Sequence, residues 1–301
     1  MHGGCGHHTT EKGLHVTPRV ATGLQVARFR AESASVTPGS ARSLLFTALG
    51  ELVWPAGETV RTATLVHILT GLGFEEQTAR QAIARASASD WIEARRNGRE
   101  VSWALTPKII DIFVTGSVRV YSLSRPVTDW DGRWLSVMPT IPQSRRAARR
   151  PLYAGLTWAG FGDPAPGLWL SPHVERAEEV AWLIKELDLV EHTVSLTGTV
   201  ASIGLSTSEI ISRGWDLDAL QDHYAQVLER VSRLRPVGAE EILLTHIQTM
   251  NEWQEFPRTD PQLPEALLPH WIGRRVARRI EQLRAEWTPI TRQRYAELNR
   301  A

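Results

Sequence analysis

The sequence predicts an α+β protein with an N-terminal winged helix-turn-helix, a central ferredoxin-like domain and a C-terminal all-α domain. Three observations support this prediction. Residues 41–115 contain three short amphipathic segments followed by a hairpin signal. Residues 116–200 alternate strand and helix signals in the order βαββαβ, and residues 201–301 show helical periodicity almost throughout. A chain of 301 residues is long enough for two domains or for three small ones.

The composition indicates a cytoplasmic protein. The chain carries 34 Lys and Arg against 33 Asp and Glu, a formal net charge of +1, and 42% of its residues are hydrophobic. Cys5 is the only cysteine, which excludes an intramolecular disulfide and a zinc site with several thiolates. The sequence has no apolar run of about 18 residues that could cross a membrane, and its start, MHGGCGHH, lacks the apolar core of a signal peptide. We therefore expect no membrane partner.

Residues 1–40 are predicted to form a disordered arm whose second half is basic. Gly, His, Thr, Ser and Pro dominate this segment, without a helical or a strand period. Arg19, Arg28 and Arg30 outnumber Glu32, which suits a segment that lies along phosphates. The first histidines and Cys5 could bind a soft metal ion, but a flexible tail is the preferred interpretation, and no metal site is predicted.

Residues 41–115 are predicted to form the winged helix. Leucine and alanine recur at helical spacing from Ala41 until Trp54-Pro55, where proline should end the helix. A second helix is expected over residues 62–70 and a third over residues 75–88, with the third burying a stripe of alanine and isoleucine. Asn97-Gly98 then predicts a tight type I′ hairpin turn, because both of its central residues need a positive φ.

Positive charge is concentrated on the third helix and the hairpin. Residues 78–99 hold five arginines against Asp90 and Glu93, a net charge of +3 in a chain whose total is only +1. Such a basic helix and wing are typical of a surface that faces DNA. The alternative is a solvated surface that happens to be basic.

The remaining segments predict the other two domains. A helix near residues 107–115 should lead to a strand at 131–142, a basic helix at 143–156, strands at 158–162 and 167–172, a helix at 173–188 and a strand at 193–199. Domains with the βαββαβ order have many different functions, so this order does not identify a function. Helices are then expected from residue 215 to about 234, at 240–252 and at 271–287, and residues 256–271, with their four prolines, should pack on these helices.

Seven strings of this sequence, in order, are similar to those of one protein family. They are ARSLLFTALGE; TARQAIARA with WIEARRNGREVSWALT; YSLSRPVTDWDGRW; LTWAGFG; PGLWLSP; WDLDALQDHY; and DPQLPEALLPHWIG. The chain therefore resembles the PaaX family of bacterial transcriptional repressors, which regulate phenylacetate and related aromatic catabolism. The similarity spans about residues 40–290. Ala86 departs from the pattern, since the family usually has a larger apolar residue there, and the N-terminal arm is not shared.

The resemblance implies a GntR-like winged helix, a middle domain similar to a CRISPR adaptation nuclease, and a helical C-terminal domain. It also implies a homodimer on a palindromic, double-stranded DNA operator. Arg80 and Arg85 match the helix that leads the DNA contacts. With their neighbours they give the candidate DNA-binding set: Arg42, Gln77, Arg80, Gln81, Arg85, Arg95, Arg96 and Arg99.

The resemblance further implies a small-molecule effector, typically an aromatic acyl-CoA such as phenylacetyl-CoA, whose binding releases the operator. An acyl-CoA needs an apolar slot for its acyl group and cations for its phosphates. The candidate ligand-binding residues of the middle domain are Trp130, Arg133, Trp134, Arg145, Arg146 and Trp158, with Arg149 and Arg150 beside them. The alternative is that the tryptophans fill the core and the arginines are solvated or bind DNA phosphate.

No catalytic residue and no cofactor are predicted. A metal-dependent nuclease needs converging carboxylates, but the first strand of the middle domain ends in Met138-Pro139. No Gly-rich phosphate loop, HExxH or Gly-x-Ser-x-Gly signature occurs either. A ligand-released dimeric repressor is thus the first hypothesis. The alternatives are a DNA-binding regulator whose middle and C-terminal domains bind a protein partner, and a metabolic enzyme with a vestigial winged helix. The helices at 215–234 and 271–287 are the expected contributors to a dimer interface.

Overall fold

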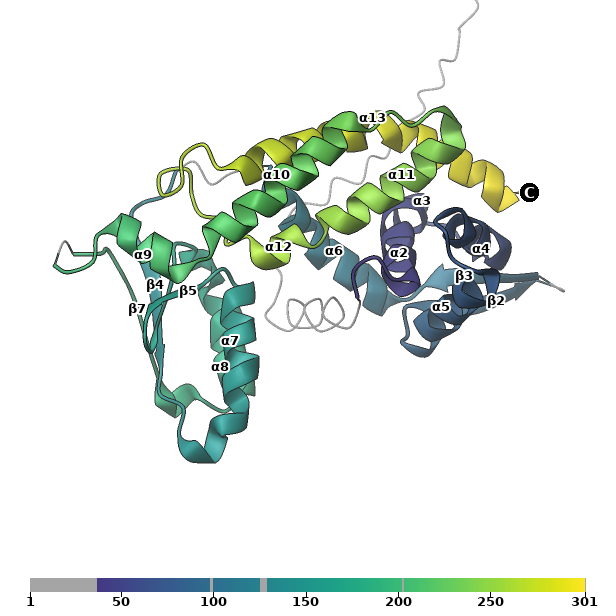
Figure 1. Ribbon diagram of the computed structural model, residues 1–301. Helices are drawn as coiled ribbons and strands as arrows, with labels where there is room; N and C mark the ends of the chain where they lie inside the picture. The colour runs from purple at the N-terminus through teal and green to yellow at the C-terminus, as the bar shows by residue number, and fades with distance from the viewer. Residues whose placement is uncertain (1–36, 98–99, 125–128, 202, 301) are drawn as a thin grey trace, which may run out of the picture.

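The computed structural model describes residues 37–97, 100–124, 129–201 and 203–300. Figure 1 shows three bodies: an N-terminal unit, a middle domain that extends away from it, and a layer of long helices that covers both. The arm predicted for residues 1–40 lies outside the described residues apart from its last four. Arg99 also lies outside them.

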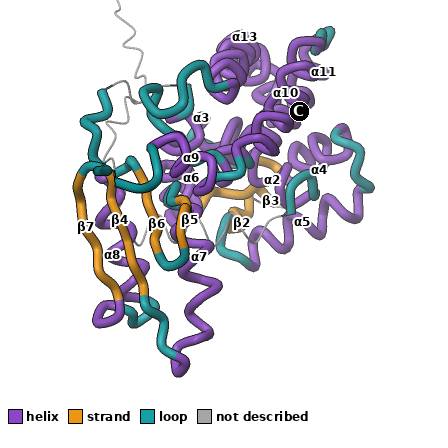
Figure 2. Tube along the Cα trace, turned by 60° about the vertical axis from the view of Figure 1, so that its left-hand side comes forward, coloured by secondary structure: helices purple, strands orange, loops and turns teal. Residues whose placement is uncertain are grey.

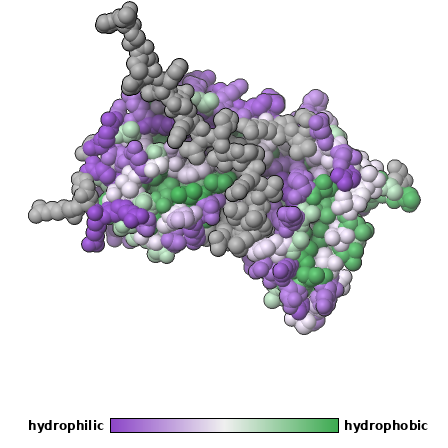
Figure 3. Space-filling view, turned by 180° about the vertical axis from the view of Figure 1, so that it is seen from behind, coloured by the Kyte–Doolittle hydropathy of each residue, from purple (hydrophilic) through white to green (hydrophobic). Residues whose placement is uncertain are grey.

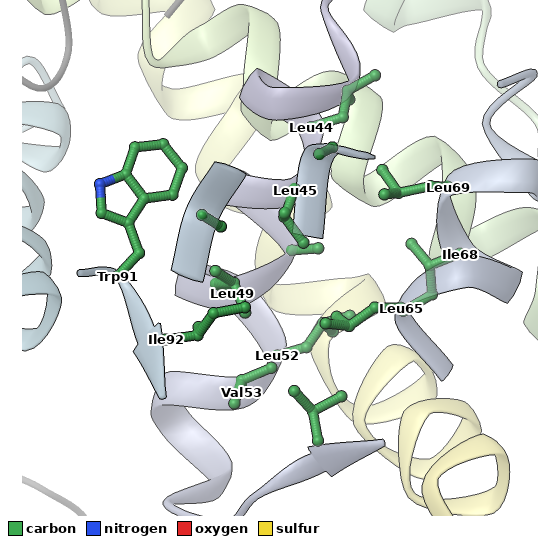
Figure 4. Close-up of a cluster of buried hydrophobic side chains, with 14 of the residues drawn as sticks. Leu44, Leu45, Leu49, Leu52, Val53, Leu65, Ile68, Leu69, Trp91 and Ile92 are labelled. Atoms are coloured by element: carbon green, nitrogen blue, oxygen red, sulfur yellow. The ribbon is translucent and has the colours of Figure 1, made fainter. Parts of the chain in front are cut away.

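The N-terminal unit consists of helices and a small sheet. Its elements are α2 (Ala41–Ala48), the π-helical η1 (Leu49–Val53), α3 (Trp54–Ala56), β1 (Val60–Arg61), α4 (Thr62–Gly71), α5 (Glu76–Ala88), β2 (Ile92–Asn97) and β3 (Glu100–Leu105). The sheet has the order β1-β3-β2 with antiparallel pairs. Leu45 and Leu49 of the first helix pack against Leu65 and Leu69 of α4 (Figure 4), so one apolar core joins the elements.

Two local expectations for this unit are wrong in detail. The first helix includes Pro55 and ends at Ala56, with Gly57 as its C-cap at a φ of 68°. Pro55 stands in the first turn of α3, after a widened π-helical turn, where its missing N–H costs little. In the hairpin, Asn97 pairs with Glu100 and is therefore the last residue of β2 rather than part of the turn. Gly98 lies outside the described residues.

Helix α6 (Pro107–Ser122) leads out of the N-terminal unit. Thr106 caps it by accepting a hydrogen bond from the backbone N–H of Ile109, and Pro107 occupies its first turn. The helix is longer than the expected 107–115, because its buried residues Ile109, Ile112 and Phe113 are followed by Val120, which enters the core of the helical layer.

The middle domain has the predicted βαββαβ order. Its elements are β4 (Trp134–Pro139), the 3-10 helix η2 (Gln143–Ala148), α7 (Arg149–Trp158), β5 (Gly162–Ala165), β6 (Leu168–Ser171), η3 (Val174–Arg176), α8 (Ala177–Glu186), η4 (Val190–His192) and β7 (Thr193–Gly198). The strand order is β5-β6-β4-β7, and all neighbours are antiparallel. Helices α7 and α8 cover one face of this sheet (Figure 2). Strand β5 lies at 162–165 rather than at the expected 158–162, because Trp158 is still the last residue of α7.

The C-terminal part is helical, as predicted. It contains α9 (Thr207–Gly214), α10 (Leu217–Arg233), α11 (Gly238–Trp253), α12 (Phe256–Thr259) and α13 (Ile272–Arg300). The proline-containing segment between α12 and α13 packs on the helices. Within it, Asp260 accepts hydrogen bonds of 2.8 Å each from the Tyr224 hydroxyl and the Trp271 indole N–H. No helix in the described part of the chain is both long and apolar enough for a transmembrane span.

Helix α13 is longer than the expected 271–287. It continues through Pro289 and ends at Arg300. Its first half packs in the core of the helical layer, whereas Tyr295 and Leu298 near its end join the core of the N-terminal unit. One helix therefore connects the two cores.

Candidate nucleic-acid interface

Helix α5 presents a polar face to solvent. Ala79, Ala82, Ile83 and Ala86 are buried against the N-terminal core, as the sequence predicts. The opposite face exposes Gln77, Arg80, Gln81 and Arg85. The first three of these line one shallow depression together with Glu76 and Ala84. Four of the eight predicted DNA contacts thus lie on one face of one helix, and both arginine and glutamine among them can read base edges.

An ion pair that sequence reasoning missed lies on this face. Arg80 Nε donates a 2.8 Å hydrogen bond to Glu76 Oε1, one turn earlier in the helix. The spacing of four residues was the signal that could have identified it. Both side chains are about 60% exposed (59% and 62%), so the pair stabilises the helix only weakly. The pair matters for DNA recognition, because Arg80 can contact an anion only if its guanidinium is shared with the Glu76 carboxylate or leaves it.

The hairpin adds two exposed arginines beside α5. Arg95 and Arg96 follow one another in β2 and therefore point to opposite faces of the hairpin. Arg95 forms an ion pair with Glu93, whereas Arg96 has no ion pair within the described residues. Arg96 is consequently the more available cation of the two.

Arg42 lies apart from this surface. Its guanidinium stacks over the ring of Trp91 at 4.2 Å from the centroid and donates a 2.9 Å hydrogen bond to Ser89 Oγ. The side chain is half-buried between α2 and the end of α5. These contacts position the C-terminal end of α5, and Arg42 remains only a prediction as a DNA contact.

A buried ion cluster ties the N-terminal unit to the helical layer. Glu51 Oε2 lies 3.1 Å from His246 Nε2 of α11 and accepts a 3.0 Å hydrogen bond from Arg284 Nε of α13. The Glu51 side chain is only 8% exposed. Burial by itself raises the pKa of its carboxyl, but the hydrogen bond with His246 and the charge of Arg284 outweigh this and lower the pKa to about 2. Glu51 is therefore a carboxylate at all physiological pH values.

The end of α13 forms a second tie. Asn299 Oδ1 accepts a 2.9 Å hydrogen bond from the backbone N–H of Arg61, and Asn299 Nδ2 donates one of 2.9 Å to the carbonyl of Thr59. These bonds satisfy the outer edge of β1 in place of a further strand. Tyr295, 4% exposed, packs beneath them in the N-terminal core. Sequence reasoning missed this contact, because Asn299 and Arg61 are far apart in the chain.

The structure does not bring the six predicted ligand residues together. Trp130 and Trp134 touch, with ring centroids 5.4 Å apart, and Arg133 lies beside them in an ion pair with Asp131. Arg145 and Arg146 lie at the opposite end of β4, where Arg145 pairs with Asp188. Trp158 is 6% exposed, packs into the N-terminal core and carries Arg119 over its ring at 4.4 Å. The tryptophans are thus largely core residues.

Ligating side chains of the described residues are dispersed rather than clustered. The described ranges contain no cluster of three or more His, Cys, Asp and Glu side chains that could hold an ion. Strand β4 ends at Met138-Pro139 without a carboxylate. His173, the most buried histidine of the middle domain, contacts Glu175 and the carbonyl of Pro261 instead, and burial lowers its pKa.

A basic hairpin beside a helix whose outer face exposes arginine and glutamine is typical of a DNA-binding transcription regulator. The chain belongs to the PaaX family. Residues 40–109 match the model of the PaaX-like protein, residues 127–210 that of the PaaX central Cas2-like domain, and residues 215–297 that of the PaaX-like C-terminal domain. The resemblance inferred from the sequence, including a middle domain like a CRISPR adaptation protein, is confirmed.

Known proteins that are similar to this chain include a bacterial repressor and a protein of uncharacterized function. The Transcriptional repressor PaaX of Escherichia coli is 26% identical over 257 residues, which cover 81% of this chain and 79% of that protein. An uncharacterized protein of Mycobacterium tuberculosis, Rv0674, has a similar structure with a TM-score of 0.59 over 86% of this chain and 99% of that one. The latter pair is only 17% identical, so it shows a common fold.

Proposed function

We propose that this protein is a transcriptional repressor that binds a duplex operator through a winged helix. In this proposal α2, α4 and α5 are the three helices, β1–β3 are the sheet, and the β2–β3 hairpin is the wing. The supporting observation is the exposed face of α5, where Gln77, Arg80, Gln81 and Arg85 stand above a fully buried alanine and isoleucine stripe. The relative from Escherichia coli is a repressor, which agrees with this function.

The chemistry of the exposed groups divides their roles. Arginine pairs with guanine and glutamine with adenine in the major groove, and each such pair discriminates against the wrong base by about 1–3 kcal/mol. The α5 side chains are therefore proposed to read bases. Arg95 and Arg96, on a narrow hairpin, are proposed to hold phosphates or enter the minor groove, which positions the protein without reading sequence.

Substitutions on the two elements test this division. The full-length protein first selects its preferred duplexes from a random pool, and affinities are then measured on selected and scrambled duplexes at several salt concentrations. We expect Arg85→Ala to abolish the preference for the selected duplex, and Arg96→Ala to weaken both duplexes alike and lower the salt slope by about one. Arg233→Ala, on the exposed surface of α10, is the control. Equal losses from both variants on both duplexes would refute the division.

We also propose a homodimer, because one winged helix reads only one half of a palindromic operator. The apolar residues of α10 and of the first half of α13 are buried against each other within one chain, so these helices need no partner. Three exposed apolar residues lie instead at the outer strand of the middle sheet. Val194 and Leu196 of β7 are 58% and 60% exposed, and Val190 of η4, just before this strand, is 60% exposed. Figure 3 shows apolar surface over this domain.

Among the described residues strand β7 pairs with β4 alone, so its outer edge could pair with a second copy. We expect Leu196→Asp to yield a monomer in sedimentation, with weaker binding to the two-half operator. Thr197→Asp, on the opposite face of the same strand, is the control for charge. A monomeric wild-type protein on its selected duplex would refute the dimer.

An aromatic acyl-CoA such as phenylacetyl-CoA is the proposed effector. A cleft of about 690 Å³ lies between the N-terminal unit and the helical layer, and this volume suits a small molecule. Leu44, Leu72 and Phe74 line one side of it and His223 and Phe256 the other, so a bound aromatic group would touch both bodies. Glu252 and Glu255 also line the cleft and no Lys or Arg does, so in this proposal the cleft holds the aromatic acyl group and the CoA phosphates lie outside it. Gel shifts with a panel of aryl-CoA thioesters and their free acids test the effector. Release by one thioester supports it, whereas indifference to all supports a regulator controlled by a protein partner.

A further inference from the structure

Four arginines form a cluster at the far end of the middle domain. Arg145 and Arg146 lie in η2, and Arg149 and Arg150 form the first turn of α7. No acidic residue occurs between residues 139 and 162, so the segment has a charge of +4 in a chain with a total of only +1. Here the arginine cluster means these four residues.

Three of the four guanidiniums are available to a partner. Arg145 pairs with Asp188 of the loop after α8. Arg146, Arg149 and Arg150 are exposed and have no ion pair in the described residues, and Arg149 only approaches the Tyr153 ring at 5.8 Å. The domain core does not use them, since α7 buries Leu152, Gly155, Leu156 and Trp158.

The position of the cluster is electrostatically unfavourable for the isolated protein. Cations repel the positive end of a helix dipole, and the first turn of α7 carries arginine without any acidic residue. Four mutually repelling cations therefore stand at the positive end of the α7 dipole. A bound polyanion would remove both penalties.

The cluster and α5 lie on the same side of the molecule. In Figure 1 and in the rotated view of Figure 2, the start of α7 forms the lower tip of the middle domain, and α5 lies on the lower side of the N-terminal unit. Helices α10 and α13 lie on the opposite side. A rod-shaped polyanion that contacts α5 and extends towards the middle domain would approach the cluster.

We propose that the arginine cluster is a second DNA-binding surface, which holds backbone phosphates outside the base pairs that α5 reads. The proposal rests on the proposed DNA-binding function, and it assigns Arg145 and Arg146 to DNA rather than to the phosphates of an acyl-CoA. Contacts of this kind position the protein and raise its affinity without adding sequence preference.

The test uses two duplexes and two triple variants of the full-length protein. The short duplex contains only the base pairs that the wild-type protein retains in selection from a random pool, and the long duplex adds random flanking sequence on both sides. R146Q/R149Q/R150Q removes the free cations of the cluster. R275Q/R278Q/R292Q, with the same change in charge at exposed positions of α13, is the matched control. Thermal unfolding checks that each variant is folded. If the triple cluster variant is not folded, the single variant Arg150→Gln takes its place.

We expect the wild-type protein and the control to bind the long duplex more tightly than the short one. The cluster variant should bind the long duplex no more tightly than the short one, and its affinity for both should equal that of the wild-type protein for the short duplex. Its salt slope on the long duplex should be lower than that of the wild-type protein by about three, and that of the single variant by about one. The preference for the selected sequence should not change.

Three results would overturn the proposal. These are a wild-type protein that gains nothing from flanking DNA, a cluster variant that keeps the wild-type gain, and a cluster variant that loses equally on both duplexes. A cluster variant that keeps the gain but is no longer released by an aryl-CoA thioester would assign the cluster to the effector. Failure of the proposed DNA-binding function would give a different result from failure of the arginine-cluster proposal, because the wild-type protein would then select no sequence from the pool.

Discussion

The buried carboxylate of Glu51 makes the attachment of the N-terminal unit to the helical layer sensitive to acid. Its folded-state pKa is lowered from 4.5 to about 2, so folding is favoured by its ionised form. This contribution is fully present above pH values near the unfolded pKa and is lost as the pH falls towards the folded one. Glu51→Gln removes the titrating group while keeping the shape of the side chain.

The magnitude follows from the two pKa values. A fall from 4.5 to about 2 corresponds to about 3 kcal/mol of stability at neutral pH, of which about 2 kcal/mol is already lost at pH 3. The side chain is only 8% exposed, so solvent screens the interaction little. The variant should be less stable at pH 7, because Arg284 and His246 lose their buried partner.

Urea unfolding at several pH values between 7 and 3 measures the effect. We expect the stability of the wild-type protein to fall by about 2 kcal/mol more than that of Glu51→Gln over this range. Glu229→Gln, which removes an exposed carboxylate from a pair with Arg233, should follow the wild-type curve. Parallel pH curves for the wild-type protein and Glu51→Gln would refute the assignment of the lowered pKa to this cluster.

Three further outcomes are expected. Asn299→Ala should cost about 1–3 kcal/mol of stability by loss of its hydrogen bonds with Arg61 of β1 and with the preceding Thr59, and hydrogen exchange should rise at Arg61; unchanged exchange would contradict this role of Asn299. Glu76→Gln should free Arg80 and strengthen binding to scrambled DNA with a salt slope larger by about one, whereas an unchanged slope would show that the pair does not restrain Arg80. Gly162→Ala should destabilise the fold by about 1–3 kcal/mol, because a Cβ there would lie 2.6 Å from a backbone carbonyl at the end of α9. Gly198→Ala, where a Cβ has open space, should be tolerated in the same thermal-unfolding assay.

Periodicity predicted those parts of the fold that depend on near neighbours in the chain. The stripe of Ala79, Ala82, Ile83 and Ala86 identified the buried side of α5, and it thereby predicted that Gln77, Arg80, Gln81 and Arg85 would be exposed. The βαββαβ order could also be predicted from the sequence, because each helix and strand has its own local hydrophobic pattern. Boundaries were less accurate: the first helix includes Pro55, where proline was expected to end it, and the last helix continues beyond the expected residue 287.

Contacts between distant segments could not be predicted. Nothing near Glu51 in the sequence indicates His246 or Arg284, and nothing near Asn299 indicates β1. That the six candidate ligand residues do not lie together could not be predicted for another reason: tryptophan serves equally well in a core and in a binding site, and Trp158 and Trp134 are buried in two different cores. Composition alone cannot separate these two uses.

The course of α13 has a consequence for the order of events during synthesis. This helix is made after every other element described here, yet Tyr295 fills the core of the N-terminal unit and Asn299 closes the edge of its sheet. The N-terminal unit therefore begins to emerge from the ribosome first but acquires its full set of contacts last. A polypeptide that stops short of α13 has the whole α5 surface and lacks its support, so only a chain translated through residue 299 can present that surface in its finished form.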